Sequence, residues 1–158
     1  MAMTRDIVES WGRPRAVVRR LLDRGASEPF AFSLLVTFVM LAFTATAPNL
    51  AREAYLFPET PLSQRLFAAA LGLLATIPLW YLLAALGHQV ARAFGGKGSY
   101  FGGRLALFWA LVVVSPAMLV QGLVQGLLGA TTASIVAGLL VAAAFLMFWT
   151  MMLREVER

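Results

Sequence analysis

The chain lacks several residue types on which common functional sites depend. It contains no cysteine, which excludes disulfides, thiolate metal sites and cysteine nucleophiles. Charged residues make up only 13% of the sequence, against roughly a quarter in soluble domains. No Asp or Glu lies inside any of the long apolar segments. Ion-coupled carriers and proton relays usually place an acidic residue there, so this absence counts against those classes.

Motifs for catalysis and for cofactors are equally scarce. His88 is the single histidine, and no carboxylate or second histidine lies near it in the sequence, so no metal site is expected. We interpret it as an interfacial polar residue beside Gln89 and Arg92. Residues 95–99, GGKGS, depart from a phosphate loop, which requires G-x-x-x-x-G-K-[ST] between a strand and a helix. The sequence therefore predicts no enzyme activity, no cofactor and no bound metal.

Apolar residues are what the sequence has in abundance. The 158 residues are 60% hydrophobic, with a mean hydropathy of +0.78. Four segments, at about 30–47, 66–90, 105–124 and 133–153, approach or exceed the 20 or so apolar residues that a helix needs to cross a bilayer. The fold class predicted is all-α: a polytopic transmembrane helical bundle with four spans. Residues 1–28 form a basic cytoplasmic segment, residues 29–158 the single bundle domain, and the proline-rich residues 48–65 a loop.

The distribution of Lys and Arg predicts the orientation of the spans. With four spans, both termini and eleven of the 13 basic residues fall on one side, and two fall on the other, as the positive-inside rule requires. Splitting the third span at Ser115 and Pro116 would give five spans and a weaker division of nine against four. The excess of Arg over Lys, with much Ala, Leu and Gly, is typical of GC-rich bacterial genomes. We expect a multi-pass protein of the bacterial inner membrane with both termini cytoplasmic.

The N-terminal segment has the pattern of two short helices. The first is expected from about residue 4 to residue 10, and the second begins at Pro14 and ends near Gly25. In the second, apolar residues at 17, 18, 21 and 22 fall on one face and charged residues on the other, which predicts an interfacial amphipathic helix. Basic residues here and in the Gly-rich connector after the second span, residues 92–104, are candidates for contact with anionic lipid headgroups or a partner. They are Arg15, Arg19, Arg20, Arg92, Lys97 and Arg104.

Two prolines inside the spans, Pro78 and Pro116, predict helix kinks, because proline removes one backbone hydrogen bond. Such kinks act as hinges in some membrane proteins, but prolines are also common in membrane helices without any mechanism. Both interpretations stay open from the sequence.

The third span ends in a group of amides and small residues that predicts interhelical contact. The group consists of Gln121, Gly122, Gln125 and Gly126. The glycines allow backbones to approach, and we expect their partners to be Ala133 and Ala137 of the next helix. The alternative interpretation is a polar patch that lines a solute path.

The chain resembles the Yip1-domain family of small multispan membrane proteins in its short bacterial form. The resemblance rests on the amphipathic residues 13–22, on residues 95–100 after the second span, and on Ser115 and Pro116 in the following span. It implies a non-enzymatic membrane organiser or adaptor. Eukaryotic relatives are associated with vesicle trafficking and small GTPases. This chain departs from them in its span count and lacks their long N-terminal region.

Two functions from different classes follow. The first is a non-enzymatic membrane organiser, adaptor or accessory subunit that acts through protein and lipid contacts, with self-association or other membrane proteins as partners and no role for nucleic acid. The second is a small permease or lipid-handling transporter with a polar path near Gln121 and Gln125. If the protein is an organiser, these amides should lie in a dry, tightly packed environment. If it is a transporter, they should face a hydrated interior.

Overall fold

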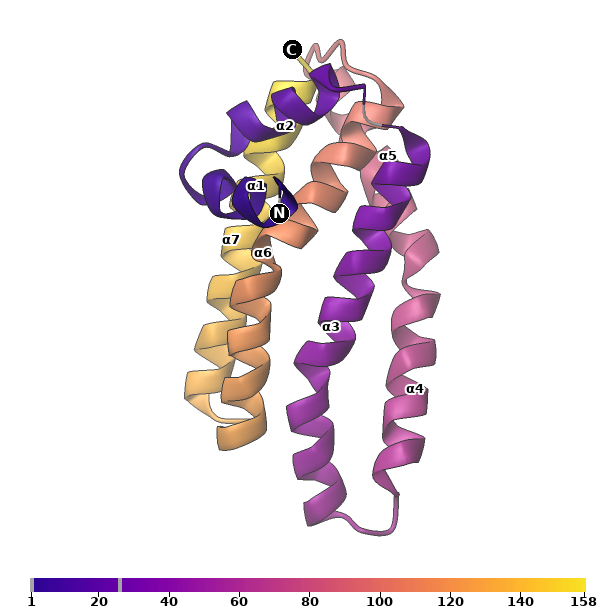
Figure 1. The fold of residues 1–158 in the computed structure, drawn as a ribbon, viewed down its shortest axis with the longest axis vertical. Helices are drawn as coiled ribbons and strands as arrows, with labels where there is room; N and C mark the ends of the chain where they lie inside the picture. The colour runs from indigo at the N-terminus through magenta and orange to yellow at the C-terminus, as the bar shows by residue number, and fades with distance from the viewer. Residues whose placement is uncertain (1, 26) are drawn as a thin grey trace.

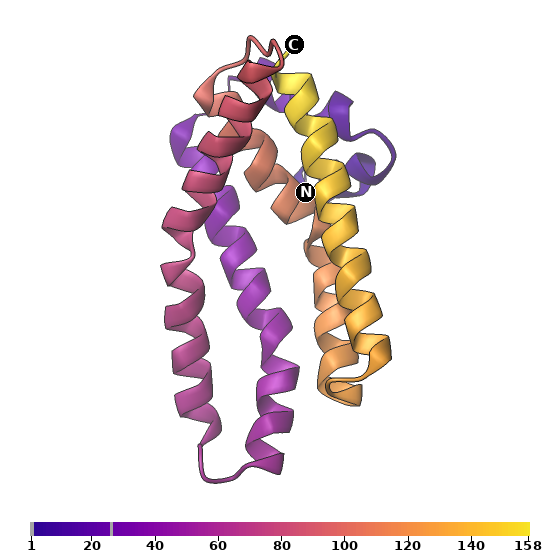
Figure 2. The ribbon, with the colours of Figure 1, turned by 180° about the vertical axis from the view of Figure 1, so that it is seen from behind.

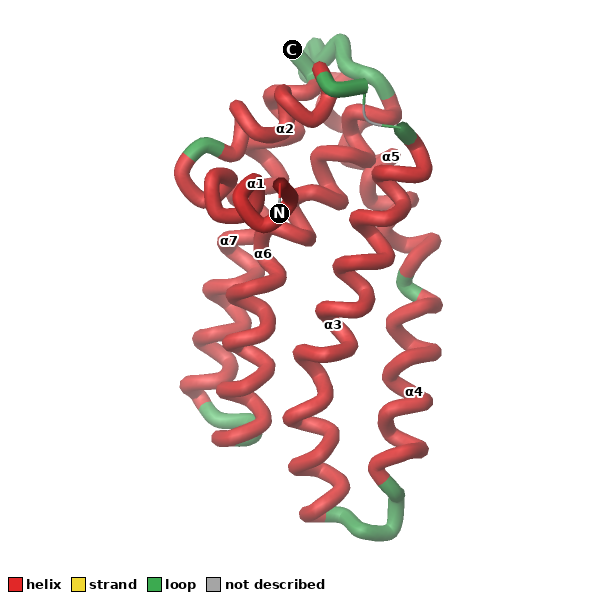
Figure 3. The backbone as a smooth tube through the Cα atoms, in the orientation of Figure 1, coloured by secondary structure: helices red, strands yellow, loops and turns green. Residues whose placement is uncertain are grey.

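The computed structural model describes residues 2–25 and 27–158, which form seven helices without a strand (Figures 1 and 3). The all-α prediction is confirmed. The helices are α1 (Ala2–Gly12), α2 (Pro14–Asp23), α3 (Glu28–Leu56), α4 (Leu62–Ala75), α5 (Ile77–Ala93), α6 (Tyr100–Leu128) and α7 (Thr132–Val156).

Four helical stretches are long and apolar enough to cross a membrane, as predicted. They are Glu28–Leu56, Leu62–Ala93, Tyr100–Leu128 and Thr132–Val156. The prediction of a loop over residues 48–65 is wrong, because α3 continues through Pro48 to Leu56 and α4 begins at Leu62. A proline stops a helix only where the freed backbone groups find no other partner, and membrane helices tolerate it well.

The loop observed in the structure, residues 57–61, is held in place by contacts with Arg65. Its guanidinium donates to the carbonyl oxygens of Thr60 and Phe57 and forms an ion pair with Glu53 at 3.1 Å. Glu53 also accepts from the amide of Asn49 one turn earlier in α3. These contacts extend α3 beyond the apolar segment and set the tight turn into α4.

Helix α6 is the centre of the bundle. Along its first half, residues 105–115 are all buried, which is the pattern of a helix surrounded by others. It packs extensively against α3 and α7 and also contacts α1, α2 and α5. Figure 2 shows α5 and parts of α3 and α7 beside its upper half, while its lower half runs beside α7.

Helices α1 and α2 are built into this core. Val17, Val18 and Leu21 of the amphipathic α2 are buried, and α2 packs on α7 and α6. The predicted amphipathic pattern is present, and the neighbours of these three side chains are the protein's own helices. The indole of Trp109 donates to the buried hydroxyl of Ser10 at 3.0 Å, which joins α6 to α1. The N-terminal helices therefore share the buried core of the spans.

Both prolines named from the sequence lie at irregular points of the spans. Helix α4 ends at Ala75 and α5 begins at Ile77, so Pro78 stands in the first turn of α5, where its missing N–H costs nothing. Pro116 lies inside the continuous α6. Figure 1 shows α6 running obliquely in its first half and alongside α7 in its second. The indole of Trp11 donates to the carbonyl of Val113, in the turn before Pro116, at 3.2 Å.

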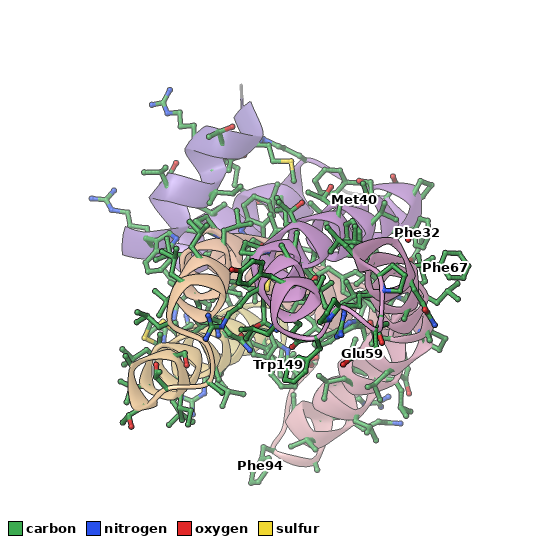
Figure 4. All side chains as sticks on the ribbon, turned by 90° about the horizontal axis from the view of Figure 1, so that it is seen from below. Phe32, Met40, Glu59, Phe67, Phe94 and Trp149 are labelled. Carbon is green, nitrogen blue, oxygen red and sulfur yellow. The ribbon has the colours of Figure 1, made fainter. Side chains whose placement is uncertain are left out.

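Large apolar side chains cover the outside of the spans. Met40 of α3 is 63% exposed and Phe67 of α4 is 67% exposed, and Figure 4 shows Phe67 pointing away from the bundle. Contiguous apolar surface of this extent needs an apolar surrounding, which a bilayer supplies. The α1–α2 pair, residues 94–99 and the C-terminus gather toward one end, and residues 57–61 and 129–131 lie at the other (Figure 3).

Candidate functional site

The site begins with a buried pair at the end of the bundle where α5, α7 and the Gly-rich connector meet. Nδ1 of His88 lies 2.5 Å from Oε1 of Glu157, and both side chains are almost completely buried. The sequence placed His88 beside Gln89 and Arg92, but its ring is buried and its partner is Glu157. The ring of Tyr100 covers that of His88 with a centroid separation of 4.3 Å. The pair fixes the C-terminal end of α7 to α5.

The glycines of the connector make room for this carboxylate. A Cβ at Gly96 would lie 2.7 Å from Oε2 of Glu157, and one at Gly98 would lie 2.4 Å from the carbonyl oxygen of Val156. The backbone N–H of Gly98 donates to Oε2 of Glu157, and that of Lys97 donates to its carbonyl oxygen. The stretch that superficially resembles a phosphate loop thus encloses the protein's own C-terminal segment. Sequence reasoning found the glycines but had no signal for their partner.

A groove opens beside this pair, between α5 and α7. Its volume is about 870 Å³, within the range of about 300–1,000 Å³ that is usual for small-molecule sites. Trp149 of α7 forms part of the wall by lying against Gly87 of α5, where a Cβ would meet its ring at 2.7 Å. Figure 4 shows Trp149 between the helices and Phe94 projecting outward. The large apolar residues of this α5–α7 groove are Leu83, Leu86, Val90, Phe94, Trp149 and Leu153.

Basic side chains line one end of the α5–α7 groove. Lys97, Arg154 and Arg158 belong to its lining, together with Glu157. Among the described residues Lys97 and Arg154 form no ion pair, and Arg158 contacts only Glu155, at 3.4 Å. Glu157 is held by His88 and by the connector. The groove therefore joins an apolar interior to a basic mouth.

The six basic residues singled out from the sequence divide into two groups. Arg19 pairs with Glu155, Arg20 with Asp6 and Glu9, and Arg104 with Glu28. In the part of the chain that the structure describes, the other three form no ion pair and are exposed. These three are Arg15, Arg92 and Lys97. The first group is engaged in holding the fold together, and the second is free to meet lipid or a partner.

One internal ion cluster joins α1 to α2. The guanidinium of Arg20 donates to Glu9 at 2.9 Å and to Asp6 at 2.6 Å. The hydrogen bond from Arg20 holds the pKa of the Glu9 carboxyl below its ordinary value, and the same bond raises the pKa of Arg20. Both shifts favour the charged forms, so the cluster is intact at neutral pH.

A family model, that of the Yip1 domain, matches residues 8–157 of the sequence. The match includes all of the spans, the connector and Glu157. The chain belongs to the Yip1-domain family. No curated protein and no solved structure gave a significant match. This Yip1-domain protein is a membrane protein, with four helical stretches able to span the bilayer.

In the amide and glycine group of the Yip1-domain protein, the glycines pack on α3 and the two amides bond to each other. A Cβ at Gly122 would lie 2.1 Å from the carbonyl oxygen of Ala45, and one at Gly126 would lie 2.4 Å from Cβ of Pro48. The expected close approach is present, but the expectation that the glycines face the small residues of the next helix is wrong, because their partner is α3. Gln121 instead donates to Gln125 at 3.2 Å.

The His88–Glu157 pair and the α5–α7 groove differ in their accessibility. Among the described residues no three His, Asp or Glu side chains converge in a way that would hold a metal ion. His88 and Glu157 satisfy one another in a buried setting and lie beneath the connector. What remains accessible is the α5–α7 groove and the exposed cations around it.

Proposed function

We propose that this Yip1-domain protein is a non-enzymatic organiser or adaptor of the bacterial inner membrane. Both termini face the cytoplasm in this proposal, and the protein acts through contacts with anionic lipid and with other membrane proteins or further copies of itself. The positive-inside rule supports this orientation, because the N-terminal helices, the connector and the C-terminus carry most of the basic residues.

The main support comes from the α1–α2 pair, which we call the basic hairpin. It is attached to the spans by the hydrogen bond from Trp109 to Ser10 and by the ion pair of Arg19 with Glu155. Its exposed cations Arg5, Arg13 and Arg15 nevertheless form no ion pair among the described residues. Unpaired cations beside a membrane attract anionic headgroups or acidic partner surfaces. A fixed basic surface of this kind suits recruitment better than transport.

The basic hairpin also presents apolar side chains beside its cations. Val8 is 70% exposed and Trp11 is 49% exposed. Aromatic residues next to arginine are enriched at protein–protein contacts. The combination supports an adaptor that contacts a partner at the membrane surface.

A small permease with a path near Gln121 and Gln125 is the competing function. The two amides hydrogen-bond to one another, and the glycines beside them bring α6 against the backbone of α3. These contacts are those of helix packing. They favour the organiser over the transporter.

Mild crosslinking in native membranes, followed by purification, tests this proposal. Wild type is compared with a hairpin variant (Arg5→Gln, Arg13→Gln, Arg15→Gln) and with a control variant (Gln121→Leu, Gln125→Leu). We expect defined protein partners with wild type and the control, and their loss with the hairpin variant. Recovery of no partner, with a lipid or small solute that copurifies with wild type and is lost from the glutamine variant, would support transport instead.

A further inference from the structure

We propose that the α5–α7 groove binds one anionic phospholipid, with its phosphate at Lys97 and Arg154 and an acyl chain along Leu83, Leu86 and Trp149. This deepens the proposed function and rests on its orientation of the protein, because it names one occupant and one place for the lipid contact. Three observations carry it: the length of the groove, its lining, and the charge at its mouth.

The length of the groove matches one leaflet. On α5 it extends from Leu83 to Phe94, which at a rise of 1.5 Å per residue is about 17 Å. The hydrocarbon core of a bilayer is about 30 Å thick, so a leaflet contributes about 15 Å. A path through the membrane would need twice this length. The groove therefore accommodates a lipid that enters from one side.

The lining of the groove is suited to an acyl chain. Its deep part is formed by leucines and by Trp149, whose ring lies on the bare backbone at Gly87. Leu86 is 53% exposed and Val90 is 58% exposed, although both line this concave surface. Exposed apolar walls without a protein neighbour are covered by lipid when they lie at membrane depth.

The charge at the mouth selects an anionic headgroup. Lys97, Arg154 and Arg158 line the end of the groove nearest the connector. The carboxylate of Glu157 lies in the same lining but is held by His88 and by the N–H of Gly98. Arg158 is paired with Glu155 and Glu157 with His88, while Lys97 and Arg154 form no ion pair among the described residues, so the mouth is net positive at the level of the headgroups. A phosphate carrying no compensating ammonium group fits this balance best.

A photo-crosslinking experiment tests the proposal. The full-length protein is reconstituted in vesicles that contain a phosphatidylglycerol probe with a photoreactive acyl chain, or the matching phosphatidylcholine probe. Crosslinked residues are mapped by mass spectrometry. We expect the anionic probe to attach preferentially at Leu83, Leu86 and Trp149, and the zwitterionic probe to attach there several-fold less.

Two variants test the contribution of the headgroup and that of the acyl chain separately. Lys97→Gln with Arg154→Gln is expected to reduce attachment of the anionic probe by about fivefold for each charge removed. Leu86→Trp is expected to block the groove and abolish attachment at Trp149. Arg5→Gln with Arg13→Gln removes the same charge from the basic hairpin and is expected to leave attachment in the groove unchanged.

Other outcomes would overturn the proposal. Attachment spread evenly over the apolar faces, or insensitive to Lys97→Gln with Arg154→Gln, would show bulk lipid only. A crosslink from the groove to a second copy of the chain would show a protein interface. Loss of probe attachment on addition of inorganic phosphate would show that the groove binds an anion and not an acyl chain. Labelling of the termini in intact cells reports the orientation separately, so the inference and the proposed function can fail independently.

Discussion

Nδ1 of His88 and Oε1 of Glu157 lie 2.5 Å apart, although 69 residues separate them in the chain. The contact joins the end of α7 to α5, and the N–H of Gly98 in the Gly-rich connector donates to the same carboxylate. It therefore shapes the mouth of the α5–α7 groove. Together with the hydrogen bonds from the backbone of Lys97 and Gly98 to Glu157, this buried pair holds the connector against the end of α7.

Replacing His88 by leucine should destabilise the protein by about 1–3 kcal/mol, because Oε1 of the buried Glu157 loses its hydrogen-bond partner. Unfolding by sodium dodecyl sulfate titration in mild detergent measures the change. Glu59→Gln, at an exposed loop position, is the matched control and should have no effect. A His88→Leu variant as stable as wild type would show that the pair contributes nothing to the fold.

Replacing Gly122 by alanine should force α6 away from α3, because the new Cβ would lie 2.1 Å from the carbonyl oxygen of Ala45. Overpacking of this kind costs about 1–3 kcal/mol. Gly72→Ala in α4 is the control, since a Cβ there meets nothing within 4 Å. The same titration should show destabilisation at Gly122 and equal or higher stability at Gly72, where alanine is the better helix former. Equal effects at the two positions would contradict the close approach of α3 and α6.

Acid should weaken the basic hairpin through Glu9. Its pKa is held low by the hydrogen bond from Arg20, so the folded state binds the Glu9 proton less readily than the unfolded state. The stabilisation is then present above the ordinary glutamate pKa and is lost as the pH falls through the lowered pKa. Thermal unfolding should distinguish wild type from Glu9→Gln at neutral pH, and the difference should close in acid. A difference that persists unchanged at low pH would exclude this ion pair as its source.

The sequence predicted the architecture well because apolar length and charge bias are local signals. Four runs of suitable length and the excess of basic residues on one side sufficed for the four spans. The end of α3 was mistaken because Pro48 and Asn49 have the composition of a turn. A proline in a membrane helix is compatible with continuation, and Asn49 bonds within the helix to Glu53.

The contacts of the site could not be predicted from the sequence, because they join residues that are distant in the chain. The spacing of Gly122 and Gly126 predicts close approach but does not name the neighbour, and the true partner, α3, is far away in the chain. His88 and Glu157 show no local pattern, since their meeting depends on how α5 and α7 pack. The glycines of residues 95–99 do indicate the close approach of a backbone or ligand, but they do not identify it.

The most direct test of the central claim, a four-span bundle with its basic end in the cytoplasm, is a topology map by single cysteines. The chain has no cysteine of its own, so each introduced thiol reports one position. Exposed sites are chosen at both ends of the bundle: Arg15, Phe94 and Arg158 at one, Glu59 and Ala130 at the other. With a membrane-impermeant maleimide on intact bacterial spheroplasts, we predict labelling of Glu59→Cys and Ala130→Cys alone, and of the other three only after lysis. Labelling of Arg15→Cys and Arg158→Cys from outside, or of Glu59→Cys and Ala130→Cys from opposite sides, would contradict the account.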